Sequence, residues 1–127
     1  MTEKEIRETI NKFIAAEISD ENREWFPELD ADAIRSDPYF HFGESDRHES
    51  QESKCYFAAR CAAVNMLAVR IYKRAIAKYA ETNLADYYDS TIWARRAKDL
   101  AWDCMKCKTK NWKDWIEYWI DFEIKRS

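Results

Sequence analysis

The sequence has very few of the residues that make turns, with one glycine and two prolines among 127 residues. Sheet folds need such residues in number, so their scarcity favours helices joined by short polar connections. The chain also lacks an apolar run of about 18 residues, which predicts that no helix spans a membrane. An apolar content of 46%, with 15% aromatic residues, excludes a disordered chain. At this length we expect a single domain, residues 1–127.

The sequence also lacks the short motifs of common enzymes. A single glycine excludes phosphate-binding loops made by the backbone, and neither a nucleophile elbow nor a metalloprotease helix is present. We therefore predict no enzymatic activity and no cofactor. The first residues are charged and lack the apolar core of a signal peptide. We expect a cytoplasmic protein, in which the four cysteines are reduced thiols.

The longest apolar stretch lies in the middle of the chain and predicts a central helix over Lys54–Ala80. Within residues 55–69 only Arg60 and Asn65 are strongly polar. Apolar residues recur at steps of three and four and form two lines along this helix. A helix with two apolar lines contacts neighbouring helices on more than one side. The first line is Phe57, Cys61, Val64, Ala68, Ile71 and Ala75, and the second is Val69, Tyr72, Ile76 and Tyr79.

Three further amphipathic segments predict helices over about residues 3–18, 90–108 and 112–125. Thr2 and Glu5 fit a capping box, and Asn111 fits the cap of the last helix. Residues 19–45 are less regular and predict one or two short helices, one of them starting at Asp37–Pro38 because proline is favoured at a first helical position. The predicted fold is all-α, a single-domain helical bundle of four main helices around the central one.

Charge is distributed unevenly, although the net charge is only −3. Residues 17–52 carry twelve acidic side chains against three basic ones, whereas residues 54–80 carry six basic side chains and no acidic one. Residues 90–113 carry seven basic and two acidic side chains. Either the acidic third folds onto the basic two thirds, or one of these surfaces faces a charged partner.

A protein-binding module is the function that these features favour. Six tryptophans, seven tyrosines and six phenylalanines exceed the needs of a small helical core, and such side chains dominate interface hot spots. At 100° per residue Trp102 falls opposite the inner face of its helix. The hypothesis is an inhibitor or immunity-type protein that occludes a basic, nucleic-acid-handling partner. The predicted contact residues are Glu21, Glu24, Glu28, Asp30, Asp32 and Trp102. A homodimer interface is the alternative use of the aromatic residues.

Binding of nucleic acid is the second hypothesis. Cations that follow phosphates and aromatic rings that stack on bases are typical of single-strand binders. The candidate residues are Arg95, Arg96, Lys98 and Lys106. A sequence pI near 5.5 argues against it, because such domains are usually basic.

A structural zinc site is the third hypothesis, with Cys55, Cys61, Cys104 and Cys107 as ligands beside two histidines. The C-x-x-C spacing of Cys104 and Cys107 suits zinc, but it lies in a helical pattern without a turn. Cys55 and Cys61 fall about 240° apart around a helix, so both cannot point at one ion unless the start of the helix unwinds. Small core residues are the ordinary role of such cysteines.

Overall fold

The computed structural model describes residues 1–41, 50–80, 90–107 and 111–126. Within these ranges the chain forms six helices and no strand, which confirms the all-α prediction. Four helices are long and two are short: α1 (Glu3–Glu17), α2 (Asp20–Trp25), α3 (Ala31–Ser36), α4 (Gln51–Ala80), α5 (Ser90–Lys106) and α6 (Trp112–Arg126). None of the described helices has both the length and the apolar composition that crossing a bilayer requires.

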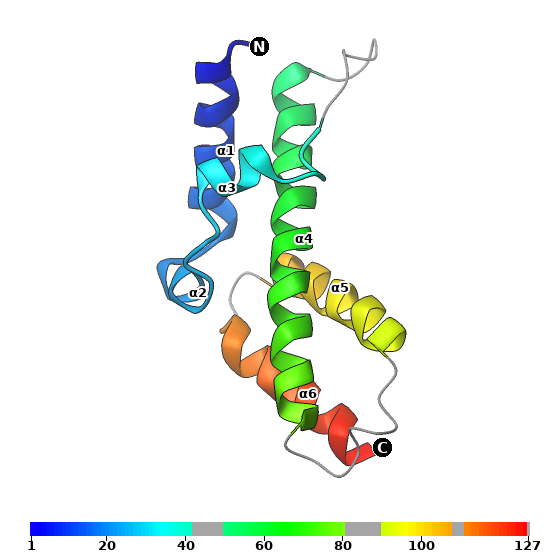
Figure 1. The fold of residues 1–127 in the computed structure, drawn as a ribbon. Helices are drawn as coiled ribbons and strands as arrows, with labels where there is room; N and C mark the ends of the chain where they lie inside the picture. The colour runs from blue at the N-terminus through cyan, green and yellow to red at the C-terminus, as the bar shows by residue number, and fades with distance from the viewer. Residues whose placement is uncertain (42–49, 81–89, 108–110, 127) are drawn as a thin grey trace.

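The 30-residue helix α4 runs through the molecule, and the other helices pack around it (Figure 1). Helices α1 and α3 contact its first half and one another, while α5 and α6 cross its second half. Helix α2 lies below α1 and packs mainly against α6. Helix α4 begins at Gln51, three residues before the predicted start, because the Ser50 hydroxyl accepts a hydrogen bond from the Ser53 N–H at 3.1 Å.

The buried face of α4 is rotated relative to the prediction. Phe57 is 55% exposed and Val69 is 47% exposed, so placing both in the core was wrong. The buried positions of the first half are instead mostly alanines, including Ala59, Ala62 and Ala63. Helix axes approach most closely over small side chains, so the alanines rather than the largest apolar residues set the packed face.

The two strongly polar residues in this stretch of α4 both bind the N-terminal part of the chain. Arg60 pairs with the buried carboxylate of Glu17 at 2.5 Å, and the Asn65 amide donates to Asp37 at 2.9 Å. Asp37 follows the end of α3, so the prediction that Asp37–Pro38 starts a helix was wrong. The extended backbone of Asp37 (ψ 138°) explains the difference, since proline disfavours helical geometry in the residue before it.

Candidate protein-binding surface

The acidic segment, defined here as residues 20–32, contains α2, a short connection and the start of α3. Both helices are too short to be stable alone and are held by their caps and neighbours. The Ser19 hydroxyl accepts from the Asn22 N–H at 3.3 Å, and the Asp30 carboxylate accepts from the Ala33 N–H at 2.8 Å. In the sequence both Ser19 and Asp20 are suitable caps for a short helix, and the structure uses Ser19. The Asp30 cap was not predicted, because periodicity placed no helix at residue 31.

Two hydrogen bonds connect α2 to the start of α6. Asn22 is buried and its side-chain oxygen accepts from the Trp112 N–H at 2.9 Å. The Asn111 amide donates to Glu21 at 2.5 Å, while its oxygen caps α6 by accepting from the Asp114 N–H at 2.9 Å. These contacts join residues about 90 positions apart, which no local pattern in the sequence reveals. They fix which face of α2 turns outward.

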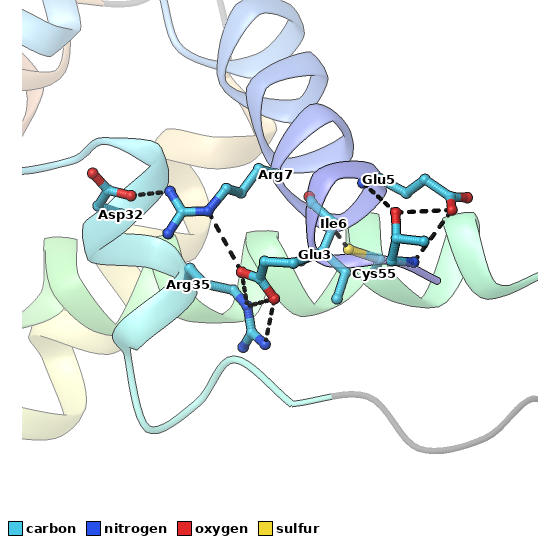
Figure 2. A network of polar contacts seen from close by, with 8 residues as sticks. Glu3, Glu5, Ile6, Arg7, Asp32, Arg35 and Cys55 are labelled. Atoms are coloured by element: carbon cyan, nitrogen blue, oxygen red, sulfur yellow. Dashed lines mark hydrogen bonds and ion pairs between the residues drawn. The ribbon is translucent and has the colours of Figure 1, made fainter.

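All five predicted acidic residues of this segment are exposed, but they differ in their bonding. Glu21 accepts from Asn111, Asp30 caps α3, and Asp32 forms an ion pair with Arg7. Figure 2 shows that Arg7 also reaches Glu3, which in turn binds Arg35 at 3.0 Å, so Asp32 belongs to a network between α1 and α3. The carboxylates of Glu24 and Glu28 form no hydrogen bond or ion pair within the described part of the chain, although the backbone carbonyl of Glu28 accepts from the Asp30 N–H at 3.0 Å.

A cleft of about 560 Å³ lies beside the acidic segment, between α2, α4 and α6. Its lining combines Glu21 and Glu24 with Trp25, whose ring lies 5.9 Å from the Arg70 guanidinium. This volume falls within the usual range for a site that accepts a small ligand or a protruding side chain, about 300–1,000 Å³. The acidic residues of α2 therefore line a concave surface with an aromatic wall.

The acidic residues of α6 are bonded differently, because they face cations of the same chain. Glu117 binds Arg74 at 2.6 Å and also Lys78, Asp121 binds Lys78 at 2.8 Å, and Glu123 binds Arg96 at 2.7 Å. Burial opposes ionisation of Glu117, but the hydrogen bonds from Arg74 and Lys78 outweigh it and lower the pKa of this carboxyl. Burial likewise disfavours the Lys78 cation, yet its bonds to Asp121 and Glu117 raise the pKa of Lys78.

Aromatic side chains of α6 form a continuous outer row. The ring centroids of Tyr118 and Trp119 lie 5.6 Å apart, and those of Trp119 and Phe122 lie 5.4 Å apart. Tyr118 is 59% exposed and Phe122 is 42% exposed. Trp102 of α5 is half-buried and packs against the core, so only part of its ring reaches the surface.

The candidate nucleic-acid residues do not form a uniform basic surface. Arg96 is paired with Glu123, and Lys98 lies 5.6 Å from the ring centre of Tyr39. Arg95 and Lys106 are exposed, but Asp99 and Asp103 are exposed between them on the same helix. Carboxylates at these positions repel phosphates, which weakens the case for nucleic-acid binding.

The four cysteines are free thiols. Cys55 and Cys104 are buried, and Cys61 and Cys107 are half-buried. Burial raises the pKa of Cys104 to about 12, with further contributions from Asp103 and Cys107, and it also raises the pKa values of Cys55 and Cys61. In the ranges that the structure describes, no three potential ligands gather around a common point, and His48 lies outside those ranges. The geometry matches core thiols better than metal ligands.

Comparison with protein-family models, with curated proteins and with solved structures gives no match.

Proposed function

We propose that this chain is a non-enzymatic protein-binding module whose acidic segment contacts a basic surface of a partner protein. The observation that carries the proposal is the contrast in carboxylate bonding. Glu24 and Glu28 are exposed and bind no cation in the described residues, whereas Glu117, Asp121 and Glu123 all do. Exposed carboxylates without partners attract an oppositely charged surface and steer its approach.

The aromatic residues beside these carboxylates supply the apolar part of such an interface. Trp25 lines the cleft between α2, α4 and α6, and charged side chains of a partner can enter this cleft beside Glu21 and Glu24. Interfaces owe most of their affinity to a few buried aromatic or arginine anchors, while charge complementarity sets partner choice and association rate. The cleft is also lined by Arg70, Arg74 and Lys113, so the attraction for an arginine or lysine of a partner comes from the exposed carboxylates of Glu24 and Glu28 beside it. Occlusion of a nucleic-acid-binding surface is a mechanism that fits this chemistry.

Affinity capture with tagged protein from its native cell lysate tests the proposal, with and without nuclease treatment. We expect one basic protein to be enriched in both conditions. Glu24→Lys with Glu28→Lys should abolish this enrichment, and because neither carboxylate binds within the fold, the variant should unfold at the same temperature as the unmodified protein. Unchanged capture by this variant would refute the proposal.

A matched control makes the same charge reversal elsewhere. Glu8→Lys reverses an exposed carboxylate of α1 that forms no ion pair within the described residues, and it should leave capture unchanged. Enrichment that disappears with nuclease, and that depends on Arg95 and Lys106, would instead support nucleic-acid binding.

A further inference from the structure

A small cavity between α5 and α6 is distinct from the acidic segment. Its volume is about 160 Å³. Helices α5 and α6 both pack on α4, and the cavity is lined by residues of both helices. Its lining combines two tryptophans, one buried and one half-buried, with the exposed carboxylates of Asp99 and Asp103. The lining residues are Trp93, Arg96, Asp99, Leu100, Asp103, Trp119 and Glu123.

The volume limits the ligand to one compact chemical group. Water occupies about 30 Å³ per molecule in the liquid, so the cavity has room for roughly five waters. Sites for drug-sized ligands and cofactors usually measure about 300–1,000 Å³. A nucleotide or another ring system of that size does not fit, whereas the head group of a side chain does.

The charges around the cavity favour a cation. Arg96 and Glu123 neutralise one another at 2.7 Å across the two helices. Asp99 and Asp103 remain, four residues apart on one helix, where like charges repel each other. In the described ranges neither carboxylate forms an ion pair or a hydrogen bond, although Arg95 and Lys106 are exposed on the same helix. A cation in the cavity would relieve this repulsion.

The walls add a second form of cation recognition. Trp93 is buried and Trp119 is half-buried, and indole is the aromatic ring that attracts cations most strongly through its face. Aromatic walls combined with nearby carboxylates recognise alkylated ammonium and guanidinium groups, which are charged yet weakly hydrated. A bare metal ion is a poorer match, since no cluster of three potential ligands is found among the described residues.

We propose that this cavity binds a single organic cation, a guanidinium or a methylated ammonium group. The group can belong to a free small molecule or to an arginine or methylated lysine side chain of a protein. The cavity shares no residue with the acidic segment, so this proposal stands or falls independently of the function proposed above.

Titration of the intact protein with tetramethylammonium chloride and with methylguanidinium chloride tests the proposal, with sodium chloride as the control for ionic strength. We expect saturable shifts of the indole N–H resonances of Trp93 and Trp119 in the nuclear magnetic resonance spectrum. Shifts that never saturate, or that sodium chloride reproduces, would overturn it.

Substitutions identify the groups that bind the cation. Asp99→Asn with Asp103→Asn should weaken binding about tenfold, since each exposed charge pair contributes up to about 1 kcal/mol, and 1.4 kcal/mol corresponds to tenfold. Both residues are exposed, so the fold should be kept. Arg96→Gln removes the internal cation that neutralises Glu123 and should strengthen binding several-fold. Glu24→Gln with Glu28→Gln is the matched control and should change nothing. An unchanged affinity in the Asp99 and Asp103 variant would contradict the proposal.

Two peptides distinguish the sources of the cation. Glycine- and serine-flanked peptides with a central arginine or trimethyllysine are compared with the free cations in the same titration. Tighter binding of a peptide assigns the cavity to a protein side chain, and tighter binding of a free cation assigns it to a small molecule. Failure of both classes to bind would refute the assignment.

Discussion

The acidic segment and helix α6 differ in how many of their carboxylates are bound by cations of the same chain. Glu117, Asp121 and Glu123 of α6 bind cations of α4 and α5 and so stabilise the fold. Glu24 and Glu28 in the acidic segment point to solvent without such partners. The difference shows that the placement of a carboxylate on its helix, rather than the local count of charges, decides whether it is structural or available to a partner.

Helical register explains the difference. Arg74 and Lys78 lie four residues apart on α4, and Glu117 and Asp121 lie four residues apart on α6, so one turn of each helix presents matching charges where the helices cross. Helix α2 has only six residues, and its inner face is occupied by the buried Asn22. Trp25 is half-buried beside Arg70, whereas Glu24 is exposed.

The largest effect is expected from loss of Trp112, the first residue of α6, which connects α6 to α2. Trp112 is fully buried, and its backbone N–H binds Asn22. Trp112→Ala should lower the free energy of unfolding by about 3–5 kcal/mol through the cavity it leaves. Chemical denaturation measures the loss, and Tyr118→Ala on the exposed side of the same helix is the control. Equal losses in both variants would contradict the packing described here.

A smaller effect is expected from the hydrogen bond that orients the acidic segment. Asn22→Ala leaves the buried Trp112 N–H without its acceptor and should lower the free energy of unfolding by about 1–3 kcal/mol. Because the bond also fixes α2 against α6, amide hydrogen exchange in α2 should accelerate more than in α1. Uniform acceleration in the two helices would show that Asn22 does not orient α2.

The charge network of α6 should give a pH-dependent effect. Glu117→Gln should lower the free energy of unfolding by about 1–2 kcal/mol at neutral pH, since its bonds to Arg74 and Lys78 are charge-assisted. The pKa of Glu117 is lowered from 4.5 in the folded protein, so its contribution is present above that pH and is lost as the pH falls through the folded value. Denaturation of both proteins between pH 7 and pH 3 should therefore show the difference shrink at the acidic end, roughly below pH 4.5. A difference that grows on acidification would contradict the assignment.

The smallest effects are expected in the acidic segment itself. Asp30→Ala should cost about 1 kcal/mol because it removes the cap of α3, while Asp30→Asn keeps an acceptor and should be nearly neutral. Glu24→Gln and Glu28→Gln should each stay within about 0.5 kcal/mol of the unmodified protein. Thermal unfolding of the four variants checks this order. A large loss in either glutamine variant would mean that the segment is structural.

The sequence predicted most of the fold because long amphipathic helices and their caps are local features. The Thr2–Glu5 capping box and the Asn111 cap are both present, and the two short helices fall within residues 19–45. The predicted contact of Phe57 with the core failed because four alanines allow a closer approach of the neighbouring helices than a periodic line of large residues does. Hydropathy alone does not show whether the alanine face or the line of larger apolar residues is the more buried one.

The candidate site was predictable only in part. Exposure of the five acidic residues followed from their charge, but their bonding depends on partners distant in sequence, such as Arg7 for Asp32 and Asn111 for Glu21. The cavity between α5 and α6 could not be predicted, because it depends on the angle at which two helices cross α4. Thr82 and Asn83, whose polar side chains predict the end of the central helix, lie outside the described residues.

The central claim is that the carboxylates of Glu24 and Glu28 serve a partner rather than the fold. The most direct measurement is the affinity of the purified partner for the unmodified protein and for the Glu24→Gln, Glu28→Gln variant over a range of salt concentrations. The account predicts binding that weakens with salt in the unmodified protein, and weaker and less salt-dependent binding in a variant of equal thermal stability. Identical affinity and identical salt dependence in the two proteins would contradict it.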